Sequence, residues 1–205
     1  MAEISTYTGG IAATNAHLLR LPGGVVLVDA PEGAAAWLRG QKARVDVLFL
    51  THQHFDHVLD AAAIRAEHGC QVFSFAPFSR DLTLERLFGM VTGSSFEVPA
   101  FEVDEVLEGR GSLEAAGETW RLYHVPGHSP DSVCFHLERE NLLFGGDVLF
   151  LDGIGRTDFP GGSTQLLLDG IETKLFALPD ATRVFPGHGD DTTIGRERSE
   201  NPFLT

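Results

Sequence analysis

The sequence predicts a protein of the α/β class, and three observations lead to that prediction. Apolar, β-branched runs alternate with alanine-rich segments of helical spacing along the 205 residues. Several of these runs end in loops that carry histidine or aspartate, and they do so in both halves of the sequence. Apolar residues make up 43% and charged residues 21%, as in ordinary globular proteins. We therefore expect one domain over residues 1–205, built from two similar β-rich halves that face one cleft.

The first half is predicted to form three strands and two helices. The turn Pro22-Gly23-Gly24 precedes the first strand, and Gly69 is the predicted end of the second helix. In chain order, the elements are a strand over residues 25–29, a short helix over 34–42, a strand over 45–50, a helix over 58–67 and a strand over 71–76.

Residues 77–109 break this alternation. Residues 81–90 have the pattern of a helix, and residues 92–108 resemble a loop because they contain Gly93-Ser94-Ser95 and Pro99. We interpret 77–109 as an excursion on the surface. It either covers one side of the functional site or is an ordinary helix with a connecting loop.

The second half repeats the theme of strands that end in polar loops. The predicted elements are a strand over residues 119–125 that leads into Pro126-Gly127-His128, a hairpin of 132–137 and 141–144 that ends in Gly145-Gly146-Asp147, a helix over 165–177, and a strand over 183–185 that leads into Pro186-Gly187-His188-Gly189.

Charge excludes some classes of partner. Fifteen Lys and Arg stand against 29 Asp and Glu, for a formal net charge of −14. Nucleic acid and anionic membranes need a basic face, so neither is an expected partner. A small anionic substrate remains compatible, because two divalent metals would add four positive charges where it binds.

The compartment follows from the cysteines and the N-terminus. Cys70 and Cys134 form no CxxC pair, which favours two buried thiols over a disulfide or a zinc ribbon. Residues 1–4 lack a basic n-region and an apolar h-region, and no apolar run approaches the ~20 residues of a membrane-spanning helix. We expect a cytoplasmic protein, whose oligomeric state the sequence does not determine.

The segment Thr51-His52-Gln53-His54-Phe55-Asp56-His57 is the strongest functional motif. It packs three imidazoles and a carboxylate together directly after an apolar run, and both groups are standard ligands of divalent metals. Together with later residues of the same types, the candidate ligands are His52, His54, Asp56, His57, His128, Asp147 and His188. Seven such ligands suffice for two metals with one ligand shared.

The spacing of these residues fits that interpretation. His52 and His54 lie two apart on an extended segment, so their side chains point the same way and can hold one metal. Asp56 and His57 lie at the turn into the following helix and can face a second metal. The remaining histidines have no ligand neighbours and are predicted to be structural: His17, His68, His124 and His136.

THQHFDH, followed in order by PGH, GGD and PGHG, resembles the metallo-β-lactamase superfamily, and within it most closely the short glyoxalase II-like hydrolases (hydroxyacylglutathione hydrolases). The resemblance extends from residue 25 to residue 198. It implies a four-layer αββα sandwich with the site between the sheet edges. It further assigns His52, His54 and His128 to a first metal, assigns Asp56, His57 and His188 to a second, makes Asp147 the bridging ligand, and gives Asp29 the role of supporting the ligand loops.

The resemblance also implies a reaction. A hydroxide that bridges two divalent metals would attack the carbonyl of a thioester such as S-lactoylglutathione, with Asp56 and Asp147 as the catalytic carboxylates. Zinc is the expected metal, and iron or manganese fits the same ligand set.

The substrate side of the resemblance is less complete. Arg156 matches a basic residue that contacts the glycine carboxylate of glutathione, whereas Asp158 replaces an aromatic residue and would repel a carboxylate. Arg156 either binds substrate or simply pairs with Asp152 or Asp158. Only 17 residues follow His188, so we expect no helical C-terminal region of the kind that helps full-length glyoxalase II bind glutathione.

Two other functions compete with hydrolysis. The segment from Gly155 to Pro160 is also similar to the persulfide dioxygenases of the same superfamily, which imply one iron on His52, His128 and Asp147. The complete ligand set and residues 193–202 favour hydrolysis. A non-enzymatic metal-binding module would predict a broken ligand set, and the set is intact.

Overall fold

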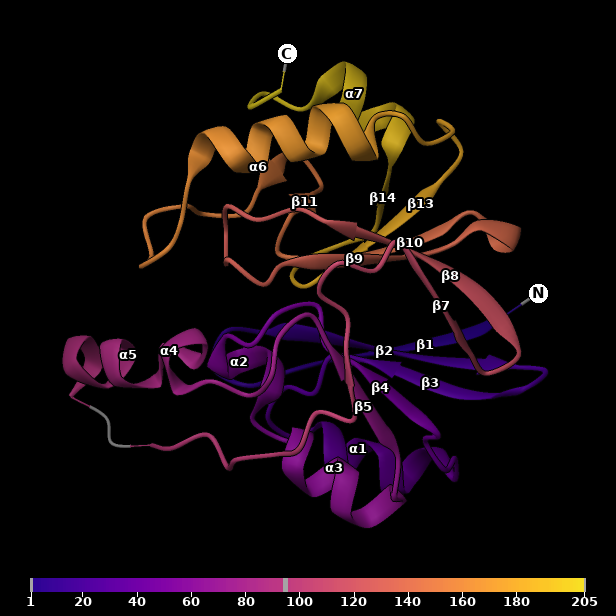
Figure 1. The fold of residues 1–205 in the computed structure, drawn as a ribbon, viewed down its shortest axis with the longest axis vertical. Coiled ribbons are helices and arrows are strands. Elements are labelled where there is room, and N and C mark those ends of the chain that lie inside the picture. Colours follow the sequence, from indigo (N-terminus) through magenta and orange to yellow (C-terminus); the bar gives the residue numbers. More distant parts are fainter. Residues whose placement is uncertain (1, 94–95, 205) are drawn as a thin grey trace.

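Two six-stranded sheets pack face to face in the computed structural model, with helices on both outer faces (Figure 1). The model describes residues 2–93 and 96–204. Helices α1 (Ala34–Gln41) and α3 (Ala61–His68) cover the N-terminal sheet, and α6 (Thr164–Gly170) and α7 (Ile194–Glu200) cover the C-terminal one. This arrangement confirms the predicted α/β class and the four-layer αββα sandwich.

The N-terminal sheet consists of strands in sequence order. The first three pair antiparallel and the last three add in parallel. The central strands are apolar because both of their faces are covered. The strands are β1 (Glu3–Gly9), β2 (Thr14–Leu21), β3 (Gly24–Val28), β4 (Val47–Phe49), β5 (Gln71–Ser74) and β6 (Glu105–Val106).

The C-terminal sheet has the order β14-β13-β10-β9-β8-β7, with only β10 and β13 parallel. Its strands are β7 (Ser112–Ala115), β8 (Glu118–His124), β9 (Val133–Leu137), β10 (Leu142–Gly146), β13 (Arg183–Pro186) and β14 (Thr192–Thr193). Smaller elements are a 3₁₀ turn (Glu138–Glu140), the hairpin of β11 (Leu149–Phe150) and β12 (Gly153–Ile154), and a π-helical turn (Ile171–Leu175) that continues α6.

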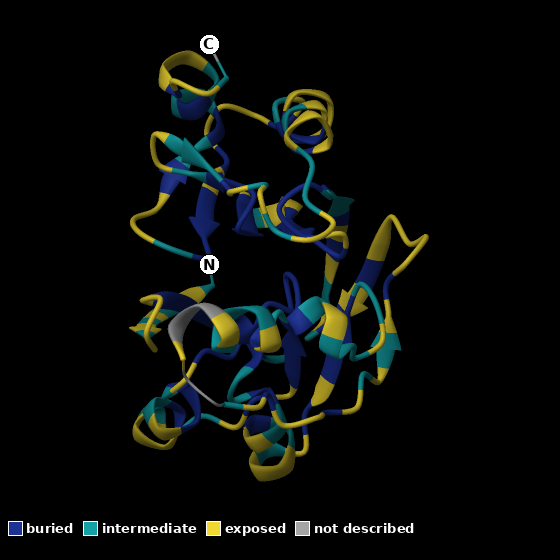
Figure 2. Cartoon of the chain, turned by 90° about the vertical axis from the view of Figure 1, so that its left-hand side faces the viewer, coloured by how far each residue is buried: buried dark blue, intermediate teal, exposed yellow. Residues whose placement is uncertain are grey.

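An aromatic core joins the two sheets. Phe49 of the N-terminal sheet stacks on Phe135 of the C-terminal sheet with ring centroids 4.4 Å apart, and it meets Trp120 edge-on at 5.0 Å. All three side chains are fully buried, and Figure 2 shows this buried interior running through both sheets. Large buried rings contribute much of the apolar area that folding removes from water. The core therefore fixes the two sheets against each other and holds their strand ends at one edge.

Most predicted elements are confirmed, with differences at the boundaries. The strands expected over residues 25–29, 45–50 and 71–76 are β3, β4 and β5. The helix expected over 58–67 is α3, and a separate short helix, α2 (Phe55–Val58), precedes it. No strand was predicted over the first 21 residues, where β1 and β2 lie.

The segment over residues 77–109 also differs from its prediction. The helix expected over 81–90 is divided into α4 (Arg80–Thr83) and α5 (Glu85–Thr92), because Leu84 takes a left-handed conformation with φ of 56°. The expected loop that follows contains β6, and residues 94 and 95 of that loop lie outside the described residues. In Figure 1, α4 and α5 lie beside α2.

Two remaining sequence predictions can be compared with the structure. Cys70 and Cys134 are free and buried, as predicted. Across the residues that the structure describes, no helix has both the length and the apolar character needed to span a bilayer.

Candidate metal centre

Strand ends from both sheets carry the predicted ligands to one place. His52 follows β4, His128 follows β8, Asp147 follows β10 and His188 follows β13. The remaining three predicted ligands belong to the loop and helix after β4. Because the aromatic core aligns the two sheets, side chains that are more than a hundred residues apart in sequence meet at this edge.

The loop after β4 changes conformation within the motif. His54 is extended, with φ of −57° and ψ of 143°, and it immediately precedes α2. His54 is therefore on extended chain, whereas Asp56 and His57 are on the first turn of α2. The change of conformation falls between the two pairs of candidate ligands.

All seven candidate ligands belong to overlapping groups. Within each group, the potential ligand atoms lie within 4.8 Å of one another. The groups are His52, His54 and His128; His52, His57 and Asp147; and Asp56, His57 and His188. The first and third groups have the same members as the two sets that the family resemblance assigns to two metals, and Asp147 lies between them.

Buried atoms in this cluster lack hydrogen-bond partners. They are the Nε2 atoms of His52, His57 and His128 and Oδ1 of Asp147. Buried polar atoms in folded proteins are almost always satisfied, because an unpaired one loses its hydrogen bonds to water without replacement. Divalent cations bound by these groups would satisfy the four atoms. The residues present therefore fit a metal centre.

Asp29 orients the N-terminal part of the cluster. Its Oδ1 accepts the backbone N–H of Thr51 at 2.8 Å, and its Oδ2 accepts the Thr51 hydroxyl and Nδ1–H of His57, each at 2.8 Å. Thr51 Oγ1 in turn lies 3.1 Å from Nδ1 of His52. Both imidazoles thus use Nδ1 for an outer contact and direct Nε2 toward the cluster, the arrangement typical of metal-binding histidines.

The C-terminal histidines have the same arrangement. Nδ1 of His128 lies 2.8 Å from the carbonyl oxygen of Arg156, and Nδ1 of His188 lies 3.1 Å from the carbonyl oxygen of Ala12. Since a carbonyl only accepts, each imidazole donates from Nδ1 and directs Nε2 toward the cluster. Backbone carbonyl oxygens thus orient the rings of His128 and His188, as the Asp29 carboxylate orients the ring of His57.

Burial sets the protonation state of the first group. Removal from water lowers the pKa of His52 and His128, and it lowers the pKa of His54 to about 3. Neighbouring imidazoles of the cluster add to the effect on all three. These side chains are neutral at pH 7, which is the form that binds metals.

In the group of Asp56, His57 and His188, acidic and basic side chains stabilise each other's charged forms. Burial opposes ionisation of Asp56, but His57 and His188 outweigh it and hold the pKa of Asp56 at about 2. Burial likewise opposes protonation of His188, but Asp147 and Asp56 raise its pKa to about 10. The closest contact is 3.2 Å between Nε2 of His188 and Oδ2 of Asp147. Both carboxylates remain ionised, as cation ligands must.

Residues of β2 support the cluster, and the sequence analysis did not find them. Thr14 Oγ1 donates to Oδ2 of Asp56 at 2.7 Å. Asn15 Nδ2 donates to the carbonyl oxygens of Pro186 and Gly189, on either side of His188, at 3.1 and 2.9 Å. The sequence signal that could have pointed to them is a pair of polar residues at the start of a strongly apolar strand, and both are buried in the structure.

Arg156 is paired on the surface beside the cluster. Its Nε and Nη2 donate to the two carboxylate oxygens of Asp158 at 2.7 and 2.6 Å, and its guanidinium lies 4.2 Å from the centre of the Phe159 ring. Asp152 pairs with Arg196 instead. Of the partners considered for Arg156, the structure selects Asp158.

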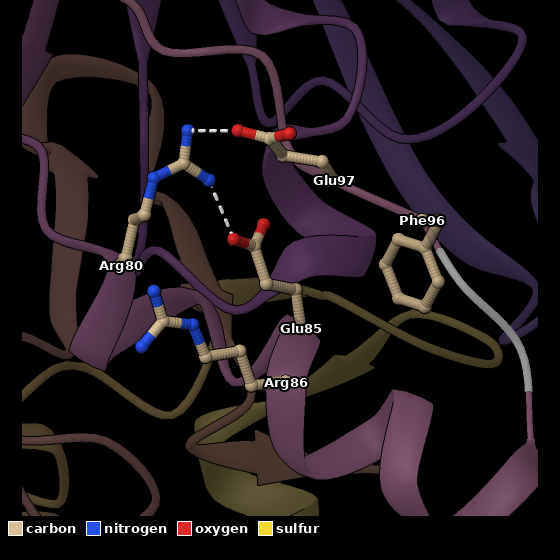
Figure 3. Close-up of a pocket in the computed structure, with 5 residues that line it drawn as sticks. All are labelled: Arg80, Glu85, Arg86, Phe96 and Glu97. Atoms are coloured by element: carbon tan, nitrogen blue, oxygen red, sulfur yellow. Dashed lines mark hydrogen bonds and ion pairs between the residues drawn. The ribbon is translucent and has the colours of Figure 1, made fainter.

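The pocket in Figure 3 is separate from the cluster. It is formed by α4, α5 and the chain after residue 95, and its lining residues are Arg80, Glu85, Arg86, Phe96 and Glu97. Arg80 bridges Glu85 and Glu97 across it. None of the candidate ligands lines this pocket.

The histidines that were predicted to be structural belong to none of the ligand groups; they are His17, His68, His124 and His136.

Comparison with known proteins adds the family. The model of the metallo-beta-lactamase superfamily matches residues 9–188. An uncharacterized protein of Mycobacterium tuberculosis is 36% identical over 219 residues, which cover 98% of this chain and 97% of that protein. Hydroxyacylglutathione hydrolase GloC of Haemophilus influenzae is 38% identical over 165 residues, which cover 77% of this chain and 75% of that protein.

Solved structures are similar over nearly the whole chain. The BLEG-1 B3 metallo-beta-lactamase superposes with a TM-score of 0.87 at 34% identity, covering 99% of this chain and 100% of that one. TTHA1623, in a di-iron-bound form, gives a TM-score of 0.83 at 33% identity, covering 98% and 100%. ETHE1 from Myxococcus xanthus gives 0.73 at 26% identity, covering 98% and 83%.

Proposed function

Because this chain belongs to the metallo-β-lactamase superfamily, we propose that it is a dinuclear metal-dependent hydrolase that cleaves a thioester such as S-lactoylglutathione. The observation that carries the proposal is the pair of complete ligand groups on either side of Asp147. The similarity to a hydroxyacylglutathione hydrolase supports a thioester as the substrate class. The free thiols of Cys70 and Cys134 are compatible with a cytoplasmic location.

In this proposal, one metal would be held by His52, His54 and His128, the other would be held by Asp56, His57 and His188, and Asp147 would serve both. Two divalent metals would supply a water with its pKa lowered toward ~7 and a Lewis acid for the carbonyl oxygen. The carboxylates of Asp56 and Asp147 are the only ones in the ligand groups among the described residues. They are therefore the groups that can orient the attacking water by accepting its hydrogen bonds.

The side chains around the ligands keep the cluster rigid. Asp29, Thr51 and the carbonyl of Arg156 fix the rings of His57, His52 and His128. Fixed ligands favour catalysis because they need little rearrangement as charge develops on the substrate. Zinc is the proposed metal, since four-coordinate imidazole and carboxylate sites suit it. The related protein in a di-iron-bound form supports iron as the alternative.

Persulfide oxidation is the second candidate. It is favoured by the similarity to ETHE1 and by the segment Gly155-Arg156-Thr157-Asp158-Phe159. A mononuclear iron enzyme would need only His52, His128 and Asp147. The structure instead keeps Asp56, His57 and His188 within reach of one another, with Thr14 supporting Asp56. The presence of the group of Asp56, His57 and His188 therefore favours the hydrolase.

The test is hydrolysis of S-lactoylglutathione by the purified protein, with metal content measured on the same sample. We expect turnover with about two metals per chain. It should be lost after chelation and restored by adding zinc back. Absence of hydrolysis, combined with one iron per chain and oxygen uptake on glutathione persulfide, would replace the hydrolase with the dioxygenase. Inertness toward thioesters and persulfides in a metal-loaded sample would favour a binding module.

A further inference from the structure

The Arg156 guanidinium is fully engaged by a neighbour in its own loop. Asp158 meets it in a bidentate arrangement at 2.6 and 2.7 Å, the geometry in which Arg binds a carboxylate most strongly. Both side chains are exposed, at 60% for Arg156 and 66% for Asp158. The Nε and Nη2 donors of Arg156, which could bind a carboxylate of a substrate, are therefore occupied by a carboxylate of the protein.

This pair lies directly beside the candidate metal centre. The Arg156 carbonyl fixes His128 at 2.8 Å, and the guanidinium covers the ring of Phe159. The Phe159 ring in turn meets His54 edge-on, with centroids 5.5 Å apart. These contacts place the Arg156–Asp158 pair one aromatic side chain away from the cluster.

Taking the proposed thioester hydrolase activity as the basis, we propose that Asp158 is a specificity-determining residue that competes with the carboxylate of an anionic thiol carrier for Arg156. A carboxylate that binds Arg156 must displace Asp158 and leave it as an uncompensated charge nearby. A thioester of a thiol without a carboxylate pays no such cost. The site therefore discriminates less in favour of glutathione thioesters than an unpaired arginine would.

The size of the effect follows from the exposure of the pair. Exposed ion pairs contribute little to stability because water and salt screen them. Asp158 can thus be displaced, and it weakens anion binding without abolishing it. We expect its removal to strengthen binding of a glutathione-derived ligand by about two- to fivefold.

The test is Asp158→Asn, which keeps the size of the side chain and removes its charge. The KM for S-lactoylglutathione should fall by about two- to fivefold, while KM for a thioester of N-acetylcysteamine, which carries no carboxylate, should stay unchanged. The dissociation constant of S-methylglutathione, measured by calorimetry, should fall by the same factor. Glu138→Gln is the matched control. Glu138 forms an ion pair with Arg121 whose exposure is similar, and it follows the C-terminal end of β9, whereas His128 precedes the N-terminal end of that strand.

The double variant Asp158→Asn with Arg156→Ala separates two explanations. If Asp158 acts through Arg156, the double variant loses the gain. A gain that persists would show general repulsion of anions and would overturn the proposal, as would unchanged or weaker S-methylglutathione binding in Asp158→Asn. The binding measurement does not depend on turnover. If no protein hydrolyses either thioester, the hydrolase function fails while the S-methylglutathione affinities still decide the role of Asp158.

Discussion

Asp29 accepts three hydrogen bonds from the ligand loop and does so from an unusual backbone position. Its φ of 61° lies in the left-handed region, which is uncommon for residues other than glycine. That conformation places the carboxylate under Thr51 and His57 at the point where β3 ends. The carboxylate therefore fixes both the path of the loop and the ring of a candidate ligand.

Asp29→Asn should lower the affinity for metal by about 10–100-fold, the usual effect of removing the outer partner of a metal-binding histidine. The amide would present a donor or a weaker acceptor to Nδ1–H of His57. Competition against a chelator of known affinity measures the change. Asp46→Asn is the control, since Asp46 accepts a backbone N–H from Val25 at the other end of β3, 2.8 Å away. Equal affinities in all three proteins would refute the role of Asp29.

His136 and His17 form a natural comparison between an unsatisfied and a satisfied buried imidazole. Both ring nitrogens of His136 are buried without partners in the described structure, whereas His17 contacts Thr6 Oγ1 and the Pro186 carbonyl, each at 3.1 Å. His136→Leu should raise the free energy of unfolding by about 1 kcal/mol, and His17→Leu should lower it by about 1–3 kcal/mol. Denaturant titration of the two variants checks both signs.

The His136 effect should also depend on pH. Burial lowers the pKa of His136 below the ordinary value of 6.5. The unfolded chain therefore binds the proton more readily, and the wild-type protein loses stability as pH falls below 6.5. The stability advantage of His136→Leu should grow over that range. An equal difference in the free energy of unfolding between His136→Leu and the wild type at pH 7.5 and at pH 5.5 would contradict this account.

At the scale of elements, β2 links the N-terminal sheet to the loop that carries His188. Asn15 donates its backbone N–H to the Gly187 carbonyl at 2.7 Å, in addition to its two side-chain bonds to Pro186 and Gly189. One residue of the first sheet thus donates to three backbone carbonyls on either side of His188. The position of His188 depends on β2 as much as on β13.

Asn15→Ala should weaken binding of one metal by about 10–100-fold and leave the other in place. The affected metal is the one assigned to Asp56, His57 and His188. Metal content per chain, measured after dialysis at stepwise lower free zinc, should show one metal lost early. Thr8→Val is the control, because it removes only the bond from the Thr8 hydroxyl to Oδ1 of Asn15. Simultaneous loss of both metals would show that the effect is not local.

These contacts also mark what the sequence predicted and what it did not. Local patterns of apolar runs and glycine turns predicted strands over residues 25–29, 45–50 and 141–144, and each lies within two residues of the observed bounds of β3, β4 and β10. Asn15 gave no such pattern, because its partners are 171 and 174 residues away. The helical spacing of residues 81–90 likewise gave no sign of the left-handed conformation at Leu84 that divides the segment.

The α4–α5 segment is held in place by one buried carboxylate. Glu85 is 4% exposed, and it accepts from Arg80 Nη1 and from the backbone N–H of Val98, each at 2.6 Å (Figure 3). The segment also packs on the ligand loop, since Phe55 contacts Phe88 and Phe96. Glu85 therefore links the start of α5 both to α4 and to the chain at Val98.

Glu85→Ala should lower the free energy of unfolding by about 2–3 kcal/mol, because it leaves a buried N–H and a partly buried guanidinium without their acceptor. Glu97→Ala is the matched control. Glu97 pairs with the same arginine but is 73% exposed, so its loss should change stability by less than about 0.5 kcal/mol. Equal effects of the two variants, measured by denaturant titration, would assign no special role to burial of Glu85.

At the scale of the whole molecule, the candidate ligands bridge the two sheets. Each of the two proposed ligand sets combines residues from the loop after β4 with one residue from the C-terminal sheet, His128 in one set and His188 in the other. The aromatic core also joins the two sheets, through contacts of Phe49 with Trp120 and Phe135. Bound metal would therefore add a second connection, at the edge where the strands end.

Metal removal should lower the melting temperature without unfolding the protein. Each metal that binds only the folded state stabilises it by about 4 kcal/mol when free metal exceeds its dissociation constant a thousandfold, which corresponds to about 8–16 °C per metal for a chain of this size. Calorimetry with and without a chelator measures the shift, and hydrogen exchange should increase most at the strand ends near His52 and His188. The aromatic core around Phe49 and Trp120 should keep its protection, since no candidate ligand lies within it. Complete unfolding on chelation would mean that the metals, rather than this core, hold the two sheets together.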